Sequence, residues 1–299
     1  MESTCNMNSG LGNQPNCIII GAMKCATSTL HDQLNMHDSF FMTDPKEPYF
    51  FSDDAVYAKG VQWYESLFAE AKAGQLKGES STHYTKLPTY PDTVKRMAAY
   101  CPSVKCIYIM RHPVDRLVSH YIHEWTQGVI SCNIDNAVYR HPELIAYSRY
   151  NMQIEPYLDF FGHAAVLPLF SERLRNNPQH ELQEVFGFLG VDETPVWHEN
   201  IRSNISAERL QKCAWRDVLV NNYALQFLRK KFVPKKIRTV IKNFWAMRER
   251  PELSPEVLKY LKGVFDKDLQ KIGLKLDLEL NCENYKQQIL SQKKIKWTK

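Results

Sequence analysis

Four short apolar runs alternate along the chain with segments of helical periodicity. The runs lack the in-and-out alternation of a strand exposed on one face, so we expect strands that helices cover on both sides. The predicted strands are Cys17–Gly21, Leu76–Glu79, Val104–Met110 and Ala164–Leu169. The predicted helices among them are Thr27–Met36, Pro91–Tyr100, Pro113–His123, Asn151–Phe161 and Gln179–Leu189. This order predicts an α/β fold: a central parallel sheet of right-handed βαβ units flanked by helices.

From about Val191 onward the pattern changes to helical segments and basic loops. The last long helix is predicted over Ser254–Gly273, with Ser254 as its N-cap, Pro255 at its start and Gly273 beyond its end. We find no internal repeat and no low-complexity linker. Residues 17–299 are therefore predicted to form a single domain with a helical, basic C-terminal part. The polar, Asn-rich residues 1–16 are predicted to form a flexible arm.

The composition is ordinary for a soluble globular protein, since 44% of the 299 residues are apolar and 24% are charged. No apolar run approaches the roughly 20 residues that span a bilayer. The N-terminus has neither the basic region nor the apolar region of a signal peptide. These features predict a cytoplasmic protein with no membrane partner.

The cysteines and histidines do not form a recognisable metal site. The 8 cysteines contain no C-x-x-C pair, and several lie in apolar strand patterns, as reduced and buried cysteines do. His120 and His123 resemble a metal-binding pair, but no third ligand follows at a usual spacing. We therefore interpret them as solvated helix histidines and predict no bound metal.

Basic residues concentrate in Arg229–Arg250, where nine of them stand with one acid, although the net charge of the chain is only +5. Such a stretch could contact nucleic acid, a membrane surface or an anionic acceptor. The alternative, which we favour, is an exposed helical face whose apolar side packs on the core. We accordingly predict no nucleic-acid partner.

Two segments contain residues of the types that bind anions or take part in catalysis. In CIIIGAMKCATSTL (Cys17–Leu30), a strand pattern ends in Lys24 and in the hydroxyl run Thr27–Thr29, where a helix pattern begins. In VKCIYIMRHPVDRLVSHY (Val104–Tyr121), Arg111 lies at the tip of a strand and Ser119 two turns into the next helix. The carboxyl ends of parallel strands and the N-termini of helices are places where α/β folds bind anions. Two such corners on one sheet predict a ligand with two phosphate-like ends.

The first segment is not a Walker A loop. That motif has four residues between its first Gly and the Gly-Lys-Ser/Thr, whereas Gly21 precedes Lys24 by three positions and Ala26 precedes the hydroxyls. Backbone amides and hydroxyls would hold one anion here, and Lys24 would neutralise charge that develops nearby. The alternative is that Thr27 and Ser28 merely cap the helix while Lys24 is solvated.

The two segments resemble the signature motifs of sulfotransferases that use 3′-phosphoadenosine 5′-phosphosulfate (PAPS). GAMKCATSTL is similar to their 5′-phosphosulfate loop, close to GxxKxGTTxL, and RHPVDRLVSHY is similar to their 3′-phosphate motif, close to RxPxxRxxSxY. KEPYFF (Lys46–Phe51) and GESSTHY (Gly78–Tyr84) resemble segments of the heparan-sulfate-type and bacterial branch. The likeness covers most of residues 17–275, and it implies the P-loop-like sulfotransferase fold.

The resemblance implies a role for each matching position. It makes Lys24 the catalytic lysine beside the oxygen that bridges phosphate and sulfate, and Glu47 the general base. It makes Arg111 and Ser119 the ligands of the 3′-phosphate. The residues that it assigns to the 5′-phosphate cradle are Met23, Lys24, Cys25, Ala26, Thr27, Ser28 and Thr29. It implies PAPS as co-substrate and no obligatory metal.

The chain departs from the family pattern in and around the cleft. Ala26 stands where Gly is usual, which narrows the backbone freedom of the loop. Ser80 replaces a lysine, Thr82 replaces a proline, and Tyr49 stands where His is common. A cleft with fewer cations predicts an acceptor that is smaller or less anionic than a polysulfated chain. The residues expected to line the acceptor cleft are Lys46, Tyr49, His83 and Tyr84.

The leading interpretation is transfer of the PAPS sulfuryl group to a hydroxyl or amine by in-line displacement. The acceptor would be a saccharide or a small natural product, such as a guanidinium alkaloid. A P-loop-type nucleotide kinase and a non-enzymatic module that binds nucleotides or polyanions are the alternatives. The sequence leaves open the acceptor, the choice between O- and N-sulfation, the residues around the adenine and the oligomeric state.

Overall fold

The structure is a computed structural model that describes residues 13–199 and 249–298. Its centre is one sheet of five parallel strands in the order β2-β3-β1-β4-β5. The strands are β1 (Cys17–Gly21), β2 (Phe40–Met42), β3 (Leu76–Ser80), β4 (Lys105–Met110) and β5 (Val166–Phe170). The predicted α/β class with a central parallel sheet is confirmed.

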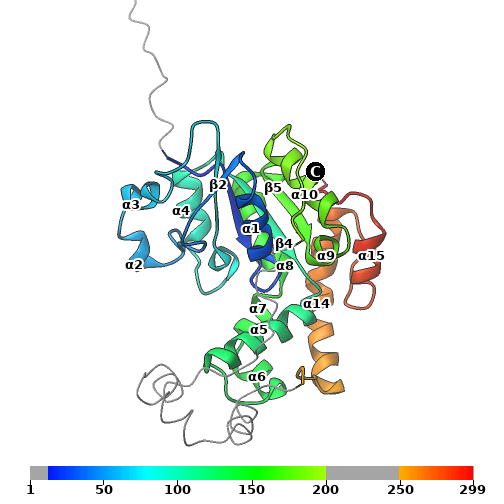
Figure 1. Ribbon diagram of the computed structural model, residues 1–299. Helices are drawn as coiled ribbons and strands as arrows, with labels where there is room; N and C mark the ends of the chain where they lie inside the picture. The colour runs from blue at the N-terminus through cyan, green and yellow to red at the C-terminus, as the bar shows by residue number, and fades with distance from the viewer. Residues whose placement is uncertain (1–12, 200–248, 299) are drawn as a thin grey trace, which may run out of the picture.

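Helices cover both faces of this sheet (Figure 1). α10 packs against β5 and α9, and its Phe186 contacts the rings of Phe40 in β2 and of His37, which follows α1. α4 and α8 pack against each other on the other side, and α14 packs along α8. The longer helices are α1 (Thr27–Asn35), α4 (Thr93–Tyr100), α5 (Pro113–Gln127), α8 (Tyr150–Phe161), α10 (Pro178–Leu189) and α14 (Pro255–Leu276). The shorter ones are α2 (Asp54–Tyr57), α3 (Val61–Ser66), η1 (Thr82–Thr85), α6 (Ile134–Arg140), α7 (Glu143–Ala146), η2 (His163–Ala165), α9 (Ser171–Asn176) and α15 (Tyr285–Ser291).

The strand sequences explain why the sheet lies inside these layers. Every residue of β1 and of β5 is buried, as are five of the six residues of β4. A strand with Ile or Val on both faces loses hydrophobic free energy unless both faces are covered, at about 25 cal/mol per Å² of apolar surface.

The strand order also decides where a ligand can bind. The chain leaves β1 through α1 toward β2 on one side, and it leaves β4 through α5 to α8 toward β5 on the other side. β1 and β4 are neighbours, so the two connections diverge and open a crevice at the carboxyl ends of these strands. Both predicted anion-binding segments follow these two strands.

Some element boundaries differ from the predictions. β2 is absent from the predictions because three residues, Phe40–Met42, give too short an apolar signal. The last long helix runs through Gly273 and ends at Leu276, with Asp277 as its left-handed C-cap. Gly273 is required inside the helix because a Cβ there would lie 2.4 Å from the carbonyl oxygen of Leu278. The glycine therefore marks a close packing contact, and the prediction that it follows the helix is wrong.

The predicted flexible arm is too long. The amide of Asn16 donates to the carbonyl of Lys77 (2.8 Å), and its own carbonyl accepts from the amide of Lys105 (3.0 Å). The side chain of Gln14 donates to the carbonyl of Tyr100. Residues 13–16 are thus fixed to the sheet, whereas residues 1–12 and most of the basic stretch Arg229–Arg250 lie outside the described residues.

The predicted solvation of the two histidines is wrong for His120, which is buried. Its Nδ1 lies 3.0 Å from a guanidinium nitrogen of Arg116, and its Nε2 lies 3.3 Å from a carboxylate oxygen of Glu124. Cys17, Cys25, Cys101, Cys106 and Cys282 are buried free thiols, as their apolar surroundings predict. No described helix is both long and apolar enough to span a membrane.

Candidate active site

The loop that follows β1 has an unusual backbone. Lys24 and Ala26 both have φ of 70°, the left-handed region that residues other than Gly seldom occupy. Ala26 is the N-cap of α1 and has no side chain that could cap it. Thr27 and Ser28 therefore lie in the first turn, where the helix amides have no acceptor within the helix. This geometry favours an anion-binding terminus over the alternative in which the hydroxyls act as caps.

A cavity of about 730 Å³ extends from this loop along α5. It brings together the predicted residues Met23, Lys24, Ala26, Thr27, Ser28, Thr29, Arg111, Ser119, Glu47, Tyr49 and His83. Segments that are far apart in the sequence thus contribute to one groove.

A hydrogen bond joins the two predicted anion-binding corners of the cavity. The guanidinium of Arg111 donates to the carbonyl of Lys24 (3.2 Å), and the amide of Arg111 donates to the hydroxyl of Tyr150 (3.2 Å). Burial lowers the pKa of Lys24, and the charges of Arg111 and Arg116 lower it further. A bound anion would therefore stabilise the ammonium of Lys24 more than that of an exposed lysine, because the anion offsets the repulsion from the two guanidinium groups.

Glu47 also lines the cavity and is held in place by its neighbours. Its Oε1 accepts from the ammonium of Lys46 (2.9 Å), and its Oε2 accepts from the hydroxyl (2.9 Å) and the amide (3.3 Å) of Thr82 in η1. Burial opposes ionisation of this carboxyl, but Lys46 and the hydrogen bonds from Lys46, Thr82 and Tyr49 outweigh it and lower the pKa of Glu47. The group is therefore a carboxylate at neutral pH.

An aromatic stack stands beside Glu47. The ring of His83 stacks on Tyr49, with centroids 3.9 Å apart, and on Tyr90 at 4.8 Å. Burial, and then the charge of Lys86, lower the pKa of His83 to about 4, so its ring is neutral. Burial also lowers the pKa of Lys86, which lines the cavity, to about 8.

Three predicted residues do not line the cavity. Tyr84 is buried, with its hydroxyl donating to Glu79 (2.7 Å), because the aromatic ring fills the core beside Phe51. Its predicted acceptor contact is therefore wrong. Cys25 is buried as well, and its amide donates to the carbonyl of Ala22 (3.2 Å). Lys46 does not line the cavity itself but holds Glu47.

Some cavity-lining residues were not predicted from the sequence, and two of them share a helical face with Ser119. His123 and Gln127 follow Ser119 at spacings of four residues along α5, and both line the cavity. This i, i+4 spacing was readable from the sequence. The other missed lining residues are Thr82, Lys86, Glu124, Ser171 and Arg175. Ser171 and Arg175 follow the carboxyl end of β5. Lys24 and Arg111 were predicted because α/β folds bind ligands at the carboxyl ends of parallel strands, and the same reasoning applies to Ser171 and Arg175.

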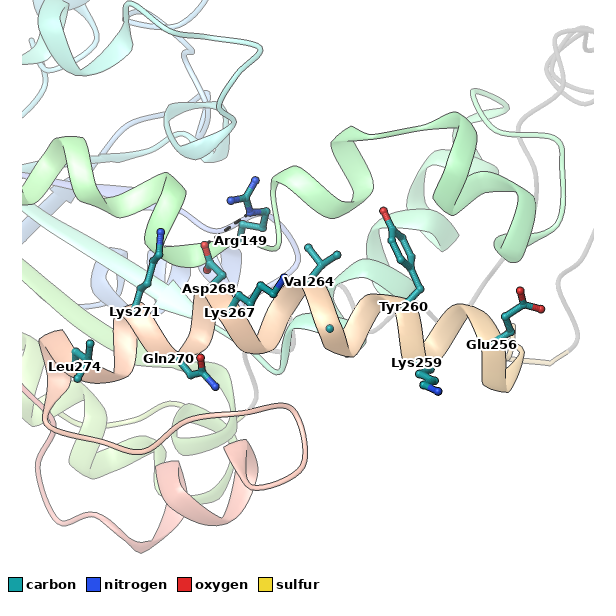
Figure 2. A pocket seen from close by; sticks show the side chains of 11 residues that line it. Arg149, Glu256, Lys259, Tyr260, Val264, Lys267, Asp268, Gln270, Lys271 and Leu274 are labelled. Carbon is teal, nitrogen blue, oxygen red and sulfur yellow. Dashed lines mark ion pairs between the residues drawn. The ribbon is translucent and has the colours of Figure 1, made fainter.

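A larger hollow, of about 1120 Å³, runs along the outer face of α14 (Figure 2). Its side chains include Lys259, Tyr260 and Lys271, and none comes from the two anion-binding segments. Asp268 at its edge has a structural role, since it accepts from the amides of Asn151 and Met152 at the start of α8. We therefore place the active site in the smaller cavity. Within residues 13–199 and 249–298, no cluster of three or more His, Cys, Asp or Glu could hold a metal.

The sequence matches the family described as "Sulfotransferase domain" over residues 14–273. The chain therefore belongs to the sulfotransferase family, as its motifs predict. The solved sulfotransferase from Alicyclobacillus acidocaldarius shares the fold, with a TM-score of 0.64, 22% identity, and coverage of 89% of this chain and 97% of that one.

Curated relatives include mouse heparan sulfate glucosamine 3-O-sulfotransferase 3B1, which is 29% identical over 194 residues. That match covers 61% of this chain and 48% of the relative. Mouse bifunctional heparan sulfate N-deacetylase/N-sulfotransferase 4 is 28% identical over 239 residues, covering 73% of this chain and 26% of that protein. The chain thus spans about half the length, or less, of these relatives.

Proposed function

We propose that this chain transfers the sulfuryl group of PAPS to a hydroxyl or amine of a small-molecule or saccharide acceptor. The observation that carries the proposal is the single cavity that joins the Lys24 loop, the Arg111–Ser119 corner and the carboxylate of Glu47. PAPS has a phosphate at each end of its nucleoside, and the cavity has two cationic corners that are linked through the Arg111–Lys24 hydrogen bond.

The residues present fit this co-substrate. The first-turn amides and hydroxyls of α1 would hold the 5′-phosphate, and Arg111 and Ser119 would hold the 3′-phosphate. When bound, PAPS supplies the activated sulfuryl group. Burial and then the charges of Arg111 and Arg116 lower the pKa of Lys24, and a bound phosphosulfate would oppose this by favouring the ammonium form.

The chemistry requires positioning and neutralisation of charge more than covalent help from the protein. Glu47 takes the proton of the acceptor hydroxyl or amine while the acceptor oxygen or nitrogen bonds to sulfur. The bond between sulfur and the bridging phosphate oxygen breaks, and Lys24 stabilises the charge that this oxygen gains. Thr82 and Lys46 keep Glu47 ionised and oriented, so it faces the acceptor as a base.

The acceptor end of the cavity favours a modest, weakly anionic substrate. Ser80, where the family pattern has lysine, is fully buried, and its hydroxyl lies 2.8 Å from Nδ1 of His31. Two carboxylates, Glu47 and Glu124, line the cavity beside Lys86. Their charges would repel sulfate groups on an acceptor, which supports an acceptor that has few of them.

The test is incubation of the purified protein with PAPS and a panel of glycans, phenols, amines and alkaloids, read by mass spectrometry. We expect a sulfated product, and we expect Lys24→Ala and Glu47→Ala each to lower turnover by about 100-fold or more while the protein stays folded. Near-normal turnover in Glu47→Ala would transfer the base role to another group, such as His83.

Thermal shift with 3′-phosphoadenosine 5′-phosphate (PAP) and with ATP addresses the kinase alternative. The proposal expects stabilisation by PAP without magnesium, whereas stabilisation by ATP alone contradicts it. A module that binds polyanions without catalysis would bind heparin with a steep salt dependence and form no product.

A further inference from the structure

Arg116, in the middle of α5, is an arginine whose side chain is fully buried. Its Nε donates to the hydroxyl of Ser148 (2.6 Å), and its Nη2 lies 3.0 Å from Nδ1 of His120 and 3.3 Å from the carbonyl of Leu144. Its Nη1 donates to the carbonyl of Met23 (3.4 Å). The guanidinium thus stands directly behind the loop that follows β1.

No carboxylate pairs directly with Arg116 in the part of the chain that the structure describes. The nearest carboxylate in its network, Glu124, is reached through the ring of His120. Burial lowers the pKa of His120 to about 3, so the ring is neutral and can accept from Arg116 while it donates to Glu124. A buried cation that lacks a direct counter-ion is costly, and an anion bound just across the loop would offset part of that cost.

The contact with Met23 also orients the loop. In a trans peptide, the carbonyl and the following amide point in opposite directions, so holding the Met23 carbonyl toward Arg116 turns the Lys24 amide to the opposite side. The next residues need such support, because Lys24 and Ala26 both have φ of 70°. Backbone in this region persists only where its surroundings determine it.

We propose that Arg116 is a positioning residue for the phosphate at the Lys24 loop: it fixes the Met23–Lys24 peptide and adds positive charge behind it. It does not touch the ligand. The inference rests on the proposed function, because it assumes that the 5′-phosphate of PAPS or PAP binds at this loop. It predicts an effect that is specific to one end of the nucleotide.

The experiment measures the dissociation constants of three ligands. PAP is measured by calorimetry, and AMP and 3′-AMP are measured by their displacement of PAP. The variants are Arg116→Lys, the milder Ser148→Ala, which removes one hydrogen bond that orients Arg116, and Ser119→Ala, which serves as a control for the other corner. Circular dichroism and urea unfolding establish that each variant is folded.

In Arg116→Lys we expect the dissociation constants of PAP and AMP to rise about tenfold, the change produced by loss of one hydrogen bond from a charged donor. The constant of 3′-AMP, which has no 5′-phosphate, should change less than about twofold. Ser148→Ala should give the same pattern with a smaller amplitude. Ser119→Ala should give the opposite pattern, with PAP and 3′-AMP weakened and AMP unchanged.

Equal weakening of all three ligands in folded Arg116→Lys would overturn the inference, because it would show a general structural role. Unchanged binding of all three would also overturn it. If Arg116→Lys does not fold, Ser148→Ala decides, and an unaltered affinity for PAP and AMP rejects the inference. Failure of the unmodified protein to bind PAP is a different result, since it rejects the proposed function itself.

Discussion

Replacing Ala26 by glycine should stabilise the protein, although glycine weakens the interior of a helix. Ala26 has φ of 70° and ψ of 22°. This left-handed conformation costs a residue with a Cβ about 1–2 kcal/mol of conformational free energy, whereas it costs glycine almost none. The backbone strain of this one residue is therefore what the substitution removes.

The opposing contribution comes from the unfolded chain. Glycine has more conformational freedom to lose on folding, which costs about 0.4–1 kcal/mol. The methyl group of Ala26 lines the cavity and is not buried in the core, so its removal sacrifices little packing. The net expectation for Ala26→Gly is a gain of about 0.5–1 kcal/mol in the free energy of unfolding.

The assay is equilibrium unfolding in urea, and Ala99→Gly is the matched control. Ala99 is exposed in the helix α4, where the same chemical change should cost about 1 kcal/mol. The two variants should therefore shift the urea midpoint in opposite directions. A loss of stability in Ala26→Gly as large as that in Ala99→Gly would refute the reasoning about the loop.

Three further predictions concern charged groups. Arg111→Ala should weaken PAP binding by about 10- to 100-fold with a smaller effect on turnover, as calorimetry and kinetics can show; unchanged affinity would exclude Arg111 from the nucleotide site. Burial raises the pKa of Glu79 to about 7 against the hydrogen bonds from Ser81, Tyr84 and Tyr64. Between about pH 4.5 and 7 the folded state therefore binds more protons than the unfolded state. The free energy of unfolding should fall by up to about 3 kcal/mol as the pH rises through this range. Urea unfolding of Glu79→Gln should show no such dependence on pH. The NMR signal of dimethylated Lys86, assigned with Lys86→Arg, should titrate near pH 8, and a midpoint near the ordinary lysine value of about 10.4 would contradict the burial argument.

The central part of the fold could be predicted because its strands are apolar on both faces. Cys17–Gly21 is predicted and observed with the same bounds, and the start of the α5 helix at Pro113 is also correct, since proline fits a first turn. Phe40–Met42 could not be distinguished from a loop, because three residues are too few to show a period. Gly273 misled the prediction, since a glycine past a helix end and a glycine at a close contact look alike in a sequence.

Site residues that directly follow a strand could be predicted from the sequence. The sequence did not show whether a side chain further along is buried in the core or lines the cavity. Lys24, Arg111 and Ser119 lie together as expected. Tyr84 was misplaced because its neighbour His83 faces the cavity, and the sequence does not show that the buried carboxylate of Glu79 attracts the tyrosine hydroxyl. His120 was misplaced for a similar reason, since its partner Arg116 is buried beside it.

The helix α5 contributes several side chains to the cavity, and under the proposed function this has a consequence for how the choice of acceptor can change. Ser119 is a proposed ligand of the nucleotide, while His123 and Gln127 lie one and two turns further along the helix, with Gln127 about 12 Å from Ser119. If the proposed function is correct, substitutions at His123 and Gln127 would change the cavity wall without removing the proposed ligands of the donor, Lys24, Arg111 and Ser119. A few substitutions on one helix could then change the acceptor while the donor site stays the same.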